Sequence, residues 1–270
     1  MDSDQNITAF ANLSGANLSS HALDGLNLEG IRLSNANLSK TNLSRCNMAG
    51  ANLYKANLRY ADLTATNLED ANLGGSNLGF AICLRASFLC ADLQKSKMSY
   101  SMSNESDFRS ANLSSAKMDH SSSISSNFKG ANLEGAYLAW ANLADAIFVD
   151  ADLRDVDFRY AILDRADLRG ANIDGASFQQ ASIEGTQFDK PLSLYDQTEG
   201  ATNLSQGKKV HEIGKDLYLS DSEIINLSKE LGIDVKHRYS IVSKADEDRI
   251  YECADKLWLN NNLKTEKFPE

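Results

Sequence analysis

The side chains that most often carry out chemistry in proteins are few in this sequence and widely separated. The histidines His21, His120, His211 and His237 lack the H-x-x-x-H or H-E-x-x-H spacing typical of zinc sites. No glycine-rich loop has the spacing that binds phosphate groups. The cysteines have no C-x-x-C spacing, which indicates free thiols rather than a disulfide framework or a metal site; they are Cys46, Cys83, Cys90 and Cys253. We therefore expect no enzymatic activity, no metal ion and no cofactor.

Aspartate and asparagine recur at five-residue spacing and could in principle bind calcium. Examples are Asp62, Asp92, Asp152 and Asp167. Calcium-binding repeats carry a glycine-rich nine-residue pattern, which does not accompany these residues. Short polar side chains more often accept hydrogen bonds from nearby backbone groups in turns. We expect this turn-bonding role for them.

Composition and charge restrict the class of protein. The chain has 270 residues, 42% apolar and 24% charged, enough for a sizeable core or for two domains. The net charge of −10 is spread without long blocks of like charge, so electrostatics favours neither nucleic acid nor a membrane surface. The first residues, MDSDQNITAF, lack the basic and apolar regions of a signal peptide, and no apolar run approaches about 18 residues. We expect a soluble cytoplasmic protein.

A period of five residues runs through most of the chain. At five-residue steps from Leu13 to Phe188, 33 of 36 residues are Leu, Ile, Met or Phe, and two residues earlier 32 of 36 are Ala, Ser, Thr or Cys. Helices repeat every 3.6 residues and strands every 2, so neither explains this period.

A second period of twenty residues indicates the shape. The three exceptions, Cys83, Ser103 and Ser123, lie twenty residues apart, and phenylalanines recur at the same spacing. Residues that share an environment every twenty positions predict a square coil of four pentapeptides, with coils stacked by backbone hydrogen bonds. The phenylalanines on the next wall are expected to compensate for the small column. The alternative is local bulging, in which flanking residues turn inward: Leu84, Met102 and Ile124.

The A-[N/D]-L-x-x pattern of residues 11–190 resembles the pentapeptide-repeat family. The resemblance implies an all-β solenoid, a right-handed quadrilateral β-helix in which the central residue and the residue two before it point inward. Nine coils at the ~4.8 Å strand spacing would make a rod roughly 43 Å long.

One outward-facing column breaks the polar pattern expected of a surface. The last residue of each pentapeptide should lie at a solvent-exposed corner, and one corner carries rings in six consecutive coils. A contiguous apolar stripe favours a contact surface for a second copy, the C-terminal segment or another protein. A self-stacked ladder that only stiffens the edge is the alternative. The predicted partner-binding residues are Tyr60, Phe80, Ile82, Tyr100, Met102, His120, Trp140 and Tyr160.

The chain changes character after Phe188. Pro191 should end the β-helix, and a helix is predicted from Ser220 or Asp221 to Gly232. A second helix is predicted from about Lys244 to Leu259. The predicted divisions are an N-terminal cap at 1–10, the β-helix at 11–190, a linker at 191–207, a small mainly helical module at 208–260 and a tail at 261–270.

Residues 208–252 resemble the small N-terminal module of bacterial translation initiation factor two. The similarity lies in Val210 to Lys215, the helix through Leu227 to Leu231, and Gly232 to His237. The resemblance implies a small helical module with a possible role in RNA or ribosome contact. Residues 208–238 hold six basic and six acidic residues, so no basic patch accompanies it, and a protein-contact or solubilising role is favoured.

Three functions follow from these observations. The preferred one is a non-enzymatic scaffold or regulatory adaptor that presents the aromatic edge to a cytosolic protein. Some pentapeptide-repeat proteins imitate DNA and protect topoisomerases, but their rods are strongly acidic, whereas residues 11–100 here hold eight basic and six acidic residues. The third is an RNA- or ribosome-associated factor acting through the C-terminal module.

Overall fold

The computed structural model describes residues 7–189, 213, 221–233 and 250. The chain forms two compact units, Met1–Thr202 and Asn203–Glu270, which are described separately below.

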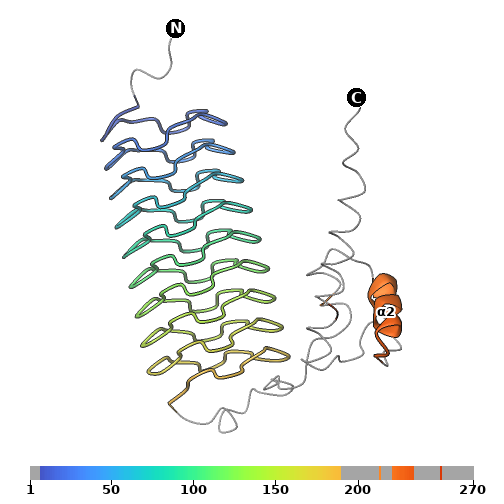
Figure 1. Cartoon of the computed structure of the whole chain (residues 1–270). Coiled ribbons are helices and arrows are strands. Elements are labelled where there is room, and N and C mark those ends of the chain that lie inside the picture. The colour runs from blue at the N-terminus through green and yellow to red at the C-terminus, as the bar shows by residue number, and fades with distance from the viewer. Residues whose placement is uncertain (1–6, 190–212, 214–220, 234–249, 251–270) are drawn as a thin grey trace, which may run out of the picture. The chain divides into compact units, whose positions relative to one another are not determined.

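Residues 11–189 wind into a parallel β-helix of four-sided coils (Figure 1). Each β-bridge joins a residue to the one twenty positions later, from Asn12–Arg32 to Asp167–Gln187. The bridges are isolated pairs separated by turns, so the walls contain no longer strands. The predicted twenty-residue coil is confirmed. We number the coils from coil 1 (11–30) to coil 9 (171–189), and the walls one to four by their central residues in coil 1: Leu13, Leu18, Leu23 and Leu28.

Backbone hydrogen bonds between successive coils hold the β-helix together. In coil 1, the Leu13 N–H donates to the Arg32 carbonyl and the Gly15 N–H to the Ser34 carbonyl, both at 2.8 Å. The Arg32 N–H in turn donates back to the Ala11 carbonyl at 2.8 Å. Three of the five N–H groups in a pentapeptide therefore bond to a neighbouring coil, which satisfies most of the backbone without long strands.

Tight turns make the corners. The Ala16 N–H donates to the Leu13 carbonyl at 3.0 Å, and the third residue of this turn, Gly15, has a φ of 73°. This is the type II turn, which requires a positive φ at its third position. Every corner residue from Phe10 to Gly185 has a φ between 55° and 77°, and 26 of them are not glycine.

The recurring Asn and Asp side chains bond within the turns, as predicted. The Thr64 N–H donates to Asp62 Oδ1 at 2.9 Å, and the Gln94 N–H donates to Asp92 Oδ1 at 3.0 Å. This bond satisfies an N–H that the inter-coil ladder leaves unpaired. Among the described residues, no three His, Cys, Asp or Glu side chains are placed to hold a metal ion.

The inward-facing side chains fill the coils, and the wall with small residues is regular. Cys83, Ser103 and Ser123 are fully buried, whereas Met102 between them is 45% exposed, so no bulge turns it inward. The next wall supplies the predicted compensating column of buried rings, stacked at 4.7–4.8 Å: Phe88, Phe108, Phe128 and Phe148. In coil 1, near the end of the rod, Leu26 departs from the inward rule and is 38% exposed.

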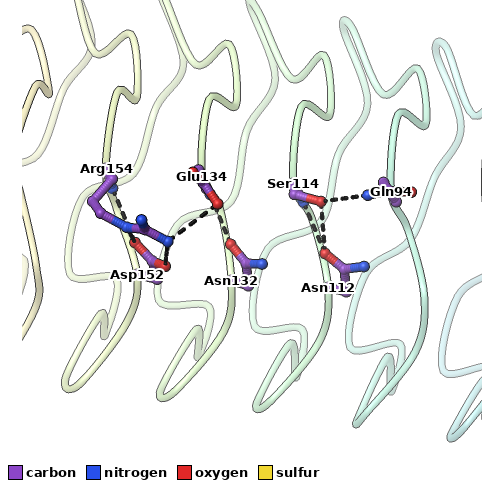
Figure 2. A network of polar contacts seen from close by, with 7 residues as sticks. All are labelled: Gln94, Asn112, Ser114, Asn132, Glu134, Asp152 and Arg154. Atoms are coloured by element: carbon purple, nitrogen blue, oxygen red, sulfur yellow. Dashed lines mark hydrogen bonds and ion pairs between the residues drawn. The ribbon is translucent and has the colours of Figure 1, made fainter.

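Wall one is polar. Figure 2 shows a network in which the Arg154 guanidinium donates to Asp152 Oδ2 at 2.6 Å and to Glu134 Oε2, one coil away, at 3.1 Å. Gln94 Nε2 donates to the Ser114 hydroxyl of the next coil at 3.1 Å. Polar groups thus link successive coils on this wall, which lies opposite wall three.

In the second unit, helix α2 spans Asp221–Glu230 and confirms the first predicted helix. Ile224, Leu227 and Ser228 are buried on one face of the helix. The Gly232 N–H donates to Lys229 and the Ile233 N–H to Ser228, which is a Schellman motif with Gly232 at a φ of 71°. The second predicted helix lies outside the described residues except for Ile250, which is helical and buried. None of the described helices is long and apolar enough to cross a membrane.

Replacing a central leucine by serine tests the packing. Leu133 is fully buried, so Leu133→Ser should lower the free energy of unfolding by about 3–5 kcal/mol, because it leaves a cavity and buries a hydroxyl. The measurement is the denaturant midpoint, with Leu133→Met as the volume-conserving control. An unchanged midpoint for Leu133→Ser would contradict the inward register.

The reactivity of the cysteine thiols tests whether Cys83 points inward on a regular wall. Burial raises the pKa of the Cys83 thiol to about 12, whereas the Cys90 side chain is exposed at a corner. Because the thiolate is the reactive form, iodoacetamide near neutral pH should label Cys90 and leave Cys83 unmodified, as read by peptide mass spectrometry. Labelling of Cys83 in the folded protein at the rate of Cys90 would contradict this register.

Candidate protein-interaction surface

Six rings form a continuous stack along the corner between walls two and three. Successive ring centroids are 5.1, 5.0, 4.8, 6.1 and 4.2 Å apart, and successive ring planes lie within 17° of each other. The inter-coil ladder dictates this arrangement, because its spacing of ~4.8 Å matches the separation of offset-stacked rings. We call this stack the aromatic edge; it consists of Tyr60, Phe80, Tyr100, His120, Trp140 and Tyr160.

The aromatic edge occupies a strained backbone position without using glycine. Its six residues have φ values of 56° to 65°, a region that costs most residues roughly 1–2 kcal/mol. The other three corner columns contain ten glycines between them, from Gly15 to Gly185. The column that carries the aromatic edge contains none in nine coils, from Ser20 to Gln180. The side chains at this corner therefore supply something that glycine, which fits the backbone best, would not.

Wall three continues the apolar surface beside the aromatic edge. Ile82 and Met102 are 39% and 45% exposed, and three further apolar residues of the same wall are half-buried: Leu84, Ile124 and Ile162. We call these five residues the apolar wall. The rings are exposed as well, except for Trp140, which is half-buried. Edge and wall together form one apolar surface that spans coils 3 to 8.

Charged groups flank this surface. The Arg59 guanidinium lies 5.3 Å from the Tyr60 ring centroid and 5.4 Å from that of Phe80, within cation–π range. Near the middle of the edge, His120 Nδ1 lies 3.4 Å from Asp119 Oδ2. The Arg59 guanidinium thus lies near the rings of coils 3 and 4, whereas the Asp119 carboxyl lies beside the ring of coil 6.

The stacking decides what this surface can bind. Each ring between Phe80 and Trp140 has a neighbour on both faces, so the inner rings have no free face on which a base could stack. Platforms that bind single-stranded nucleic acid need such free faces. The edge instead offers ring edges, tyrosine hydroxyls and aliphatic side chains, which suit the apolar and aromatic anchors of a protein surface.

The structure places all eight predicted site residues on this one surface, with the six rings on the edge and Ile82 and Met102 on the adjoining wall. Their role in binding stays a prediction. The prediction omitted Arg59, although an arginine directly before the first ring of the column was a usable signal.

Comparison with known proteins identifies the fold family. The sequence pattern of pentapeptide repeats matches in eight copies, over residues 11–48, 31–70, 66–99, 124–159 and 151–189. The chain belongs to the pentapeptide-repeat family. Its rod is accordingly the right-handed quadrilateral β-helix of that family. The family pattern does not extend into residues 190–270, and the resemblance of residues 208–252 to initiation factor two stays a prediction.

The solved structure of QnrB1 shows the same fold, and two further solved structures are similar in sequence. Trypsin-treated QnrB1, a plasmid-mediated fluoroquinolone resistance protein, is 16% identical with a TM-score of 0.55, over 68% of this chain and 92% of that chain. HetL of the cyanobacterium Nostoc sp. strain PCC 7120, involved in heterocyst differentiation regulation, is 26% identical with a TM-score of 0.25, over 68% and 91%. The pentapeptide repeat protein alr5209 of Nostoc PCC 7120 is 33% identical with a TM-score of 0.22, over 42% and 79%. A search of curated proteins finds no significant match.

Replacing one ring tests whether the aromatic edge serves binding or stabilises the fold. Trp140→Ser should lower the free energy of unfolding by only about 1–2 kcal/mol, because the half-buried ring loses two stacking contacts while the ladder stays intact. Denaturant unfolding measures this cost, with Leu133→Ser as the comparison. If Trp140→Ser unfolded the protein as far as Leu133→Ser, the edge would be a structural element.

Proposed function

We propose that this pentapeptide-repeat protein is a non-enzymatic scaffold or regulatory adaptor that presents the aromatic edge and the apolar wall to a cytosolic protein partner. The observation that carries the proposal is the glycine-free corner, where rings, five exposed and one half-buried, are kept at positive φ in six consecutive coils. A surface that keeps costly side chains exposed is more often used for contact than for stability.

The rest of the rod supports a passive, rigid presentation of this surface. Described residues 11–189 continue the five-residue register without insertion, so the β-helix carries no loop that could close over a substrate. The edge is therefore held straight and at fixed spacing, which reduces the ordering cost of binding. We further propose that the module at residues 208–260 adds a second contact.

Ion pairs on three walls reduce the unpaired negative charge that imitation of DNA would need. Aspartates on three walls pair with the arginine two residues later at 2.6–2.7 Å: Asp107, Asp152, Asp157 and Asp167. The arginine beside each of Asp107, Asp152 and Asp167 holds the pKa of that carboxyl below its usual range. Such carboxylates stay ionised but are neutralised in pairs, whereas a surface that imitates DNA needs unpaired negative charge.

Affinity capture from the native host tests the proposed function. The bait is the full chain, compared with a variant in which Tyr60, Tyr100 and Trp140 are replaced by serine. We expect at least one host protein to be captured by the first and lost, by roughly tenfold or more, with the second, because hot spots concentrate in such residues. Circular dichroism checks that both baits are folded.

Tyr54→Ser is the matched control. Tyr54 is 42% exposed on wall one, away from the aromatic edge, so its replacement should leave capture unchanged. Equal capture by all three baits would contradict the proposed function, since the partner would then bind elsewhere.

A further inference from the structure

The aromatic edge has an approximate symmetry of its own. Read from coil 3 it runs Tyr60, Phe80, Tyr100; read from coil 8 it runs Tyr160, Trp140, His120. Each direction gives a tyrosine, then a phenylalanine or tryptophan, then a ring that carries a polar atom. A two-fold axis perpendicular to the rod, placed between coils 5 and 6, would therefore bring like rings of two copies together.

The same axis brings opposite charges together at the far corner of wall three. It places Arg85 of coil 4 against Asp145 of coil 7 in a second copy, since both are corner residues of that wall. Among the described residues Arg85 makes no ion pair, and its side chain is exposed. The Asp145 carboxylate accepts two bonds at 2.7 Å from Arg165 and stays 40% exposed, so it can accept another donor.

The charge of the whole rod favours the same orientation. Residues 11–110, coils 1 to 5, hold nine basic and eight acidic residues, a net charge of +1, whereas residues 111–189, coils 6 to 9, hold six basic and twelve acidic residues, a net charge of −6. Two such rods lying antiparallel set the positive half of each against the negative half of the other. Lying parallel, they would set the two acidic halves together, which costs free energy at an interface.

We propose that a second copy of this chain docks on the aromatic edge and apolar wall, antiparallel, about a two-fold axis between coils 5 and 6. The inference rests on the proposed function, because it names the partner of the same surface. Ring edges of the two ladders lie beside each other, and Met102 and Ile124 fill the centre of the contact. The contact is isologous and closed, so it makes a dimer and not a fibre.

The size of the surface determines how strongly we expect the two copies to associate. Edge and wall span six coils, roughly 25 Å at the ~4.8 Å spacing, which places the contact at the small end of stable interfaces. The dimer should therefore dissociate reversibly on dilution, with the apolar centre setting its lifetime and the Arg85–Asp145 pairs its orientation.

Sedimentation velocity of the full chain, over a hundredfold range of concentration, tests the proposal. The intact protein should change from the monomer mass of 29.5 kDa to twice that mass. Arg85→Asp and Asp145→Arg should each weaken association by about tenfold or more, because each sets like charges together. The double variant Arg85→Asp/Asp145→Arg should restore it, since the reversed pair again attracts.

Arg154→Asp is the matched control. It also breaks an internal ion pair, but on wall one, and should leave association unchanged. A parallel dimer would set Arg85 against the ring column of its partner, so the double charge reversal would not rescue it.

Two results would overturn the proposal. One is a monomer at every concentration; the other is a dimer that neither the charge variants nor the triple serine variant of Tyr60, Tyr100 and Trp140 weakens. A monomer that still captures a host protein through the aromatic edge would overturn the dimer alone and leave the proposed function standing. Equal capture by the intact and triple serine baits would instead remove the proposed function, whatever the oligomeric state.

Discussion

Hydrogen bonds between peptide groups of adjacent coils are the interaction on which this molecule depends. They fix the spacing of the coils at ~4.8 Å and place every residue directly beside its counterparts in the two neighbouring coils. In coils 1 to 8 they also hold the corner residues at positive φ, even where the residue is tryptophan or tyrosine. A local preference of roughly 1–2 kcal/mol per residue against this conformation is overridden there because each corner N–H has a partner in the next coil.

Because the hydrogen bonds between coils keep the coils in register, side chains at equivalent positions form columns, both inside the β-helix and on its surface. Inside, the phenylalanines of wall four stack with ring centroids 4.7–4.8 Å apart as far as coil 7. In coil 8 the equivalent residue is Leu168. There Phe158 of another wall meets Phe148 edge-on at 6.1 Å and begins a second stack with Phe178 at 5.1 Å. Outside, Asn57, Asn37 and Asn17 bond in series at 3.0–3.1 Å. On such a repeating backbone, identical side chains in successive coils lie close enough to hydrogen-bond or stack with one another.

The sequence predicted the features that depend on period, because period is a property of the chain itself. The coil length, the inward positions and the corner position of Trp140 all follow from counting, whereas the regular wall at Ser103 was one of two alternatives that counting left open. Features that depend on side-chain torsions did not follow from counting: the Arg59 contact with two rings, and the Ser106 hydroxyl that donates to the Cys83 carbonyl at 2.6 Å. Counting also cannot show that the Ser123 hydroxyl is buried with no hydrogen-bond partner among the described residues. Those outcomes depend on volumes and rotamers within each coil.

Function in such a fold has to be expressed on outward positions, because the inward ones are committed to packing. Outward residues alternate with inward ones, so the surface can change column by column while the core stays fixed. Wall one shows one use of this freedom, a polar network that links coils through Arg154 and Glu134. The corner at Trp140 shows another, in which rings replace the glycines that the backbone would accept at lower cost. Because hydrogen bonds between coils already stabilise the β-helix, these rings add little to its stability, which is why we propose that they serve contact with a partner.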